Sequence, residues 1–272
     1  MALIEVDKQT CTRCGACAAV CPGGFFIFRK GRYPRPIPAI QEFCLRCGHC
    51  VAVCPADSLD HREIPLAQCP PIEPSLKVTF EQFAQLARSR RSIRAYKDKK
   101  VPREEITRLI DVARGAPTGH NAQTVRWLVF DDRGEISRLS EIGADWMRWS
   151  VENKKGMVQF LEGVLKRQET GYDEFLRSAP AIVVAYAEKG NPIAFYDCVI
   201  ALTYLELAAG TAGLGCCWAG LLQSAATGFP PMMEVLAIPE GHVPCGCMML
   251  GYPRYGYRRS PRRQPARIAW RP

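Results

Sequence analysis

Eight cysteines between Cys11 and Cys54 form two copies of one motif, C-x2-C-x2-C-x3-C-P. The second copy repeats the first at a constant offset, and a proline follows the last cysteine of each copy, at Pro22 and Pro55. The N-terminal MALIEVDKQTC lacks the basic stretch and apolar run of a secretory signal, so we expect a cytoplasmic protein. In a reducing compartment, cysteines at this spacing indicate metal ligands and not disulfides. The eight candidate ligands are Cys11, Cys14, Cys17, Cys21, Cys44, Cys47, Cys50 and Cys54.

The spacing is that of bacterial ferredoxins, in which three close cysteines bind one 4Fe–4S cube and the fourth reaches the other cube. Zinc is the alternative, but zinc sites usually pair two C-x2-C units across a longer loop, with four ligands per ion. His49 is interpreted as a neighbour of a cluster, because four cysteines already suffice. Residues 1–60 therefore resemble a two-cluster 4Fe–4S ferredoxin domain. The predicted ligand sets are Cys11, Cys14, Cys17 and Cys54 for one cluster, and Cys44, Cys47, Cys50 and Cys21 for the other.

Residues 61–78 contain four prolines and are predicted to be a semi-rigid linker. Periodic patterns begin at Thr79, which forms a capping box with Gln82. Helices are predicted from 80, from Pro102, through much of 135–176 and over 195–211, and strands over 124–130, 181–186, 216–220 and 242–252. The helix over 195–211 is nearly all apolar, which indicates burial on every side, as in a dimer. Residues 79–272 are thus expected to form an α+β domain, with a mixed sheet flanked by helices.

The net charge of +9 is concentrated at 88–100 and in the last nineteen residues, which hold seven arginines and no acid. These segments lack the zinc-finger, RNA-recognition and helix-turn-helix patterns, so we expect no nucleic-acid partner. No stretch approaches the roughly 18 apolar residues of a membrane helix, so we expect no membrane partner either.

Four segments of the C-terminal region occur in a characteristic order: RRSIRAY (90–96), APTGHN (116–121), GLGCCWAG (213–220) and GYP (251–253), the last followed by a basic stretch. Together they resemble the FMN-dependent nitroreductase family over about residues 80–272. The resemblance implies a homodimer in which Arg90, Arg91, Ser92 and Arg94 bind the flavin phosphate, assisted by Arg262 and Arg263. It further implies that Pro117, Thr118, Gly119 and Asn121 line the flavin ring from the neighbouring subunit, and that the backbone amides of Ala219 and Gly220 face its N5 atom.

The chain departs from that family at Thr124 and Val125, where proline and tryptophan are frequent, and residues 143–175 do not match the substrate lid. The expected function is an oxidoreductase that passes electrons between two 4Fe–4S clusters and FMN. Its acceptor would be a nitroaromatic, a quinone, an activated alkene or a halogenated aromatic, and an external ferredoxin or NAD(P)H would supply electrons. The alternative is an electron-transfer or redox-sensing protein without a small-molecule substrate. No catalytic side chain is predicted, because the flavin carries the chemistry.

Overall fold

The structure is a computed structural model that describes residues 2–271, and the chain divides into two compact units. Unit 1 contains the chain up to Lys77 together with residues 120–122, and unit 2 contains the remainder. Within residues 2–271, no helix has the length and apolar character needed to cross a membrane.

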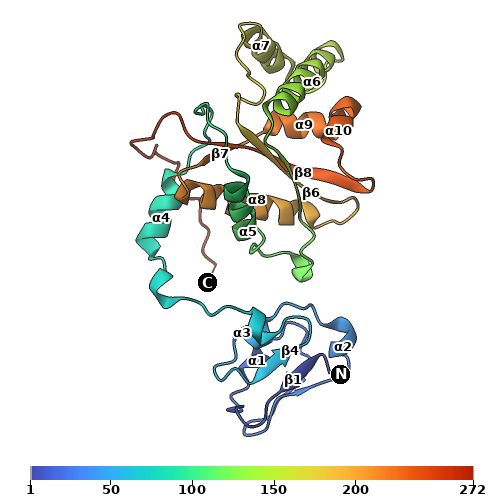
Figure 1. Cartoon of the computed structure of the whole chain (residues 1–272), viewed down its shortest axis with the longest axis vertical. Coiled ribbons are helices and arrows are strands. Elements are labelled where there is room, and N and C mark those ends of the chain that lie inside the picture. The colour runs from blue at the N-terminus through green and yellow to red at the C-terminus, as the bar shows by residue number, and fades with distance from the viewer. Residues whose placement is uncertain (1, 272) are drawn as a thin grey trace. The chain divides into compact units, whose positions relative to one another are not determined.

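Unit 1 is built from short elements around two small antiparallel ladders (Figure 1). In one ladder β1 pairs with β4, so that Ile4 lies opposite His61 and Val6 opposite Leu59. The elements are β1 (Ile4–Val6), α1 (Ala16–Ala19), β2 (Phe26–Ile27), β3 (Arg35–Pro36), α2 (Ile40–Phe43), α3 (His49–Ala52), β4 (Leu59–His61) and the 3₁₀ turns η1 (Leu66–Gln68) and η2 (Pro74–Leu76).

The cysteine repeat of the sequence is also a repeat of backbone conformation. Arg13 and Arg46 have φ of 59° and 52°, and Gly15 and Gly48, which precede α1 and α3, have φ of 77° and 70°. Left-handed residues reverse the direction of the chain sharply, so each copy curls between its first and third cysteines. The repeat therefore predicts two equivalent loops, and the structure contains them.

Unit 2 holds a four-stranded sheet between two layers of helices (Figure 1). One layer consists of α5 and α8, and the other of α6, α7, α9 and α10. The helices are α4 (Phe80–Ser89), α5 (Arg103–Ala113), η3 (Gly119–Asn121, shared with unit 1), α6 (Arg133–Glu152), α7 (Val158–Gln168), α8 (Ala194–Thr211), α9 (Gly220–Gly228) and α10 (Pro230–Leu236). The strands are β5 (Arg126–Phe130), β6 (Ala181–Glu188), β7 (Gly215–Trp218) and β8 (His242–Gly251).

The α+β class is confirmed, but the prediction of a mixed sheet is wrong for the described residues. The order is β5-β6-β8-β7, and each neighbouring pair is antiparallel. Strand β6 is buried on both faces because helices cover both sides, and such a run is also typical of parallel strands. Strand direction depends on how the long helical connections return to the sheet, which hydrophobic patterns do not encode.

A bulge in β8 changes which face its side chains cover. Ala185 pairs with Gly246 and Tyr186 with Pro244, so Cys245 is an extra residue in the ladder. Cys245 consequently packs among the residues of α5 and α8, whereas Cys247 packs on the opposite face, among those of α6 and α9.

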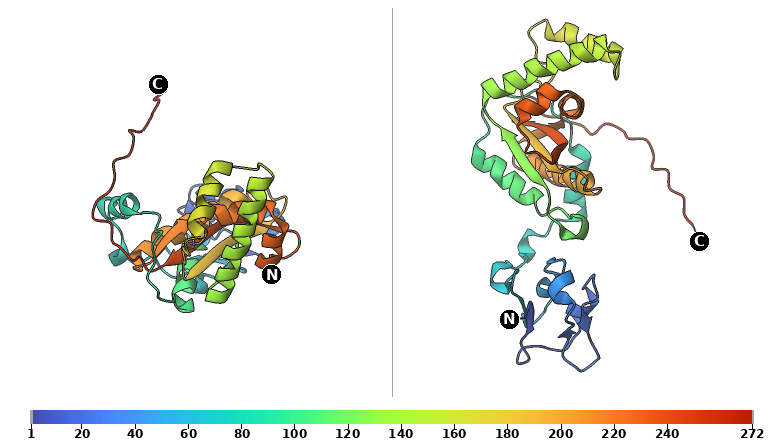
Figure 2. Two further views of the ribbon diagram at one scale, coloured as in Figure 1. Left: turned by 90° about the horizontal axis from the view of Figure 1, so that it is seen from above. Right: turned by 90° about the vertical axis from the view of Figure 1, so that its right-hand side faces the viewer.

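The predicted helices are present, including the capping box of Thr79 and Gln82 at the start of α4. The single chain buries one side of helix α8, and burial of the other side in a dimer stays a prediction. Its sheet-facing residues are buried, but Tyr196, Ile200 and Tyr204, spaced four residues apart, are 36–65% exposed on its other face. Beyond Gly251 the chain continues as an extended, exposed segment (Figure 2).

Candidate functional site

Two small cavities in unit 1 are each lined by four cysteines. The first is also lined by Ile4, Phe25, Phe26 and His61, and the second by Val6, Pro34 and Leu59. Within residues 2–271, no three Cys, His, Asp or Glu side chains are close enough to hold a single metal ion. The cysteines of the first cavity are Cys21, Cys44, Cys47 and Cys50, and those of the second are Cys11, Cys14, Cys17 and Cys54.

These are the two sets that the motif predicts, each with three cysteines from one copy and the last from the other. The curled loops hold the first three thiols of a set, and the following proline turns the fourth toward the other loop. Four thiols around an apolar cavity are the donor set that a 4Fe–4S cluster requires, so the residues fit this group. Ligation itself stays a prediction, to which the proposal below returns.

Several N–H groups point at the cysteine sulfurs. The amides of Phe25 and Ser58, which occupy equivalent positions in the repeat, donate to Cys21 Sγ at 3.4 Å and Cys54 Sγ at 3.2 Å. Such bonds stabilise negative charge on a thiolate. Burial raises the pKa of Cys50 to about 11, so this thiol is neutral at pH 7 until a metal displaces its proton.

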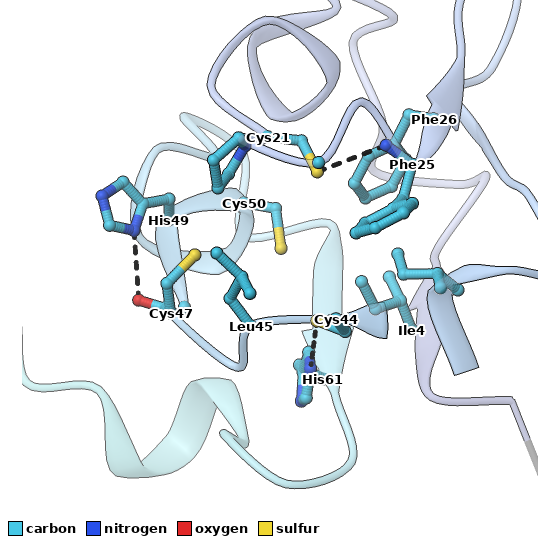
Figure 3. A pocket seen from close by; sticks show the side chains of 14 residues that line it. Ile4, Cys21, Phe25, Phe26, Cys44, Leu45, Cys47, His49, Cys50 and His61 are labelled. Atoms are coloured by element: carbon cyan, nitrogen blue, oxygen red, sulfur yellow. Dashed lines mark hydrogen bonds between the residues drawn. The ribbon is translucent and has the colours of Figure 1, made fainter. Parts of the chain in front are cut away.

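The sulfur of Cys44 is contacted by both a backbone amide and an imidazole. The Arg46 amide donates to Cys44 Sγ at 3.4 Å, and the Nε2 atom of His61 lies 3.6 Å from the same sulfur (Figure 3). Burial lowers the pKa of His61, whose side chain is almost completely enclosed. The sequence did not single out His61, which lies beyond the motif. His49, which it did consider, contacts only the Cys47 carbonyl oxygen among the hydrogen bonds of the described residues (Figure 3).

In unit 2, Arg90 and Arg91 line a pocket of about 250 Å³ with Glu206, Tyr255 and Tyr257. Arg91 Nη1 donates to the carbonyl oxygens of Arg88 and Arg90, while its Nε is buried without a hydrogen-bond partner in residues 2–271. A buried guanidinium donor without a partner is costly in a folded protein. An anion in the pocket would satisfy it, so these residues fit a phosphate.

Arg90 is anchored by a residue that the sequence did not indicate. Its Nη1 donates to Glu206 Oε1 at 2.8 Å, and the Glu206 side chain is only 7% exposed. One donor of the guanidinium is thus engaged, and four N–H groups remain for other partners. Glu206 is one of two acids within the apolar helix α8, and an acid in such a helix is the sequence signal for a buried partner.

Backbone contacts hold the RRSIRAY segment against two of the other predicted segments. Ile93 N donates to Cys216 O at 2.8 Å, and Lys97 N donates to Tyr252 O at 2.8 Å. Burial raises the pKa of Cys217, against the opposing effects of the Arg94 charge and a hydrogen bond from Ser92. The structure therefore brings Ser92 and Arg94 close to Cys217 of β7, and their role toward a phosphate stays a prediction.

The loop at 117–119 contacts helix α8 at a different point from the arginine pocket. Gly119 N donates to Asp197 Oδ1 at 3.0 Å, and Asp197 is buried, with its Oδ2 unpaired among residues 2–271. Asp197 and Glu206 are nine residues apart on α8, which corresponds to about 13 Å along the helix. One chain alone therefore does not bring Pro117, Thr118 and Gly119 next to the arginine pocket.

The two amides at the start of α9 differ in availability. Ala219 N donates to Cys247 O at 2.8 Å, which ties the helix to β8. The Ala219 N–H is therefore engaged within the chain, and its role toward a flavin stays a prediction. Gly220 begins α9 and is exposed, and the first amides of a helix have no partner within the helix.

Three predicted residues belong to the C-terminal segment or to unit 1. Arg262 and Arg263 belong to the exposed C-terminal segment, which passes the end of α4 where Ser260 Oγ donates to Arg88 O. Asn121 belongs to unit 1, where its Nδ2 donates to the carbonyl oxygens of Leu45 and Arg46. The role of Asn121 toward a flavin stays a prediction.

Two protein-family models match this chain over separate stretches of its sequence. Residues 10–59 match the model of the 4Fe-4S dicluster domain, and residues 87–252 match that of the nitroreductase family. An iodotyrosine deiodinase from Thermotoga neapolitana is 32% identical over 133 residues, covering 48% of this chain and 69% of that protein. A putative NADH dehydrogenase/NAD(P)H nitroreductase from Methanothermobacter thermautotrophicus is 25% identical over 183 residues, covering 65% and 80%.

Solved structures show the same fold. An FMN-bound nitroreductase from Bacteroides fragilis has 24% identity and a TM-score of 0.55, covering 67% of this chain and 94% of that one. An oxidised iodotyrosine deiodinase bound to FMN and 3-iodo-L-tyrosine has 25% identity and a TM-score of 0.54, covering 68% and 97%. Because the family model spans more than half of the chain, this protein belongs to the nitroreductase family and carries a 4Fe-4S dicluster domain ahead of the nitroreductase region.

Proposed function

We propose that this chain is an iron–sulfur flavoprotein oxidoreductase that binds two 4Fe–4S clusters and FMN and reduces a small organic acceptor. The observation that carries the proposal is the coexistence of two four-cysteine cavities with a pocket that holds a buried, unpartnered arginine donor. FMN, when bound, exchanges two electrons as a hydride equivalent, and iron–sulfur clusters carry electrons singly.

The arginine pocket would hold the flavin phosphate. Arg91 supplies its unpaired Nε, and Arg90, held by Glu206, presents its remaining N–H groups to the same space. Ser92 and Arg94 extend the polar surface along the segment fixed to β7. Planar guanidinium groups suit a phosphate dianion because they form paired hydrogen bonds to it.

The Gly220 amide, exposed at the start of α9, is the donor that remains for the flavin ring. A backbone N–H at a helix N-terminus stabilises negative charge that develops on a nearby atom. The same positive end of the helix would favour the reduced, anionic cofactor.

We further propose a homodimer, because the 117–119 loop and the arginine pocket lie at separate places along α8 of one chain. A second copy would bring its loop to the first copy's pocket. The exposed apolar residues of α8 supply the surface that such a pairing would cover.

Among acceptors, the likeness to an iodotyrosine deiodinase favours testing halogenated aromatics beside nitroaromatics, quinones and activated alkenes. A ferredoxin or NAD(P)H would supply electrons. The second candidate is an electron carrier or redox sensor without a substrate. It would gain support from a flavin ring covered by protein, for which the half-exposed Trp218, two residues before Gly220, is the candidate cover.

The test begins with protein purified without oxygen. We expect about eight irons, eight acid-labile sulfides and one FMN per chain. Anaerobic reduction by NADH, NADPH and reduced ferredoxin is then followed by an acceptor screen. Turnover of an organic acceptor supports the enzyme, whereas flavin reduction without turnover of any acceptor class supports the carrier. One zinc and no sulfide would show that the cluster assignment is wrong.

Two variants of the full chain separate the roles of the units. Cys14→Ala with Cys47→Ala removes a ligand from each predicted cluster and leaves unit 2 unchanged. The double variant should keep FMN and its reaction with a hydride donor, and should lose reduction by ferredoxin. Cys69→Ala is the matched control, because Cys69 lies outside both cavities. Equal rates of reduction by ferredoxin in all three proteins would contradict the proposed entry of single electrons through unit 1.

A further inference from the structure

Among the hydrogen bonds of residues 2–271, His61 is the histidine whose side chain contacts a cysteine sulfur. Its ring is 1% exposed and lies at the end of β4, with Nε2 3.6 Å from Cys44 Sγ (Figure 3). Cys44 belongs to the set formed with Cys21, Cys47 and Cys50. Neither the motif nor the family models assign a role to His61.

The hydrogen bonds of the ring determine where its proton lies. The Glu63 backbone N–H donates to His61 Nδ1 at 3.1 Å, so this nitrogen is an acceptor. In a neutral imidazole the other nitrogen then carries the hydrogen. His61 Nε2–H therefore points at Cys44 Sγ as a donor, and a buried donor of this kind acts in surroundings of low dielectric constant.

The second cavity has a different residue at the equivalent position. Phe28 precedes His61 by the same offset that separates Cys11 from Cys44, and its ring packs against Gly15. A phenyl ring has no N–H to donate. The backbone donors to Cys21 and Cys54 are shared by the two halves of the repeat, whereas the imidazole of His61 and the hydrogen bond from Thr12 to Cys14 each occur in one half only.

We infer that His61 raises the reduction potential of the cluster held by Cys21, Cys44, Cys47 and Cys50 through an N–H···S bond to Cys44. Reduction adds negative charge to a cluster, and a hydrogen bond to a ligand sulfur stabilises that charge. The two clusters are therefore unequal. When one electron is shared between them, the bond from His61 favours its place on the cluster of Cys44 over the cluster of Cys11, Cys14, Cys17 and Cys54. The inference rests on the proposed function, because it requires both clusters.

The experiment is an anaerobic potentiometric titration of the full chain, followed by electron paramagnetic resonance. In His61→Phe, the midpoint potential of one cluster should fall by about 59 mV. For a one-electron couple this corresponds to a roughly tenfold change in the equilibrium constant for reduction of that cluster. The other midpoint should not move. His61→Gln, whose side-chain amide can donate in place of the ring, should recover part of the shift.

The matched control is His49→Phe. His49 lines the same cavity but contacts a carbonyl oxygen instead of a sulfur, so both midpoints should stay unchanged. Two backgrounds identify the affected cluster. With Cys14→Ala, which leaves the Cys44 set complete, His61→Phe should still lower the remaining midpoint. With Cys47→Ala it should have no effect.

Unchanged midpoints in His61→Phe, equal shifts of both midpoints, or a shift that appears in the Cys47→Ala background would each overturn the inference. If His61→Phe loses iron, the comparison is made with His61→Gln and His61→Asn, and equal midpoints in these two and the wild type would also overturn it. A wild-type protein without eight irons would instead contradict the proposed function, so the two failures are distinct.

Discussion

Arg90 Nη1 lies 2.8 Å from Glu206 Oε1, so a residue expected to bind phosphate already neutralises a buried carboxylate. The pair connects the end of α4 to the middle of α8. Any substitution of Arg90 therefore has two effects, one on the anion pocket and one on the stability of unit 2.

The first prediction separates these effects. Arg90→Ala should lower both FMN retention and the melting temperature, because it leaves Glu206 buried and unpaired, at a cost of about 1–3 kcal/mol. Arg90→Ala combined with Glu206→Gln should recover most of the melting temperature and should not recover FMN retention. Calorimetry and the flavin content of dilute samples measure the two effects. Parallel recovery of both quantities would show that Arg90 acts on FMN only through the fold.

The second prediction concerns the unpaired donor of Arg91. Arg91→Gln removes a charged hydrogen bond worth about 1.5–3 kcal/mol, so FMN affinity should fall by about ten- to a hundredfold. Arg88→Gln is the control, because the Arg88 side chain is exposed. The hydrogen bonds from Arg91 and Ser260 reach the backbone carbonyl oxygen of Arg88, which the substitution keeps. Fluorescence titration of the flavin-free proteins gives both affinities, and equal values would place the phosphate elsewhere.

The third prediction concerns the thiols of unit 2. Burial raises the pKa of Cys247 to about 12 and raises that of Cys216 well above its usual value, so both remain protonated and enclosed at pH 8. A thiolate is the reactive species, so iodoacetamide should leave both unmodified in the native protein up to about pH 9. The partly exposed Cys69 should be labelled and serves as the internal standard. Mass spectrometry after anaerobic labelling reads all sites, and labelling of Cys216 as fast as Cys69 would disprove the prediction.

The fourth prediction concerns pH and stability. The Arg103 guanidinium, which donates to both oxygens of Asp131, lowers the pKa of that carboxyl to about 2. A lowered pKa stabilises the folded state above the unfolded value near 3.9, and this contribution is lost as the pH falls toward 2. Arg103→Gln should therefore lower the melting temperature by about 2–4 °C, for a pair worth about 1 kcal/mol whose arginine is largely exposed. The difference should be constant between pH 5 and 8, and a difference that changes across this range would exclude Asp131 as its source.

Most of the correct predictions came from local sequence patterns. The spacing of cysteines indicated two equivalent loops, and the capping box at Thr79 marked the start of α4, because both depend on neighbours in sequence. His61, Glu206 and Asp197 were missed because each acts on a partner 17 to 116 residues away. The direction of the strands and the bulge at Cys245 were missed for a similar reason, since the pairing of β6 with β8 determines them.

Predictions taken from the resemblance depended on more than residue identity. Ala219 matches its motif, yet its amide is already bonded to Cys247. Such a conflict is visible only when the backbone partners are known. Gly220, its neighbour in the same motif, keeps a free helix-terminal position and remains the candidate donor.

The exposed side chains of α8 have a consequence for how this protein is handled. Tyr196, Ile200 and Tyr204 form an apolar row on a helix whose opposite side is already in the core of unit 2. If a second copy covers this row, part of the free energy of folding comes from association and scales with protein concentration. Each tenfold dilution would then reduce the stability of the assembled state by about 1.4 kcal/mol. A melting temperature measured for this chain would describe the sample's concentration as well as the molecule.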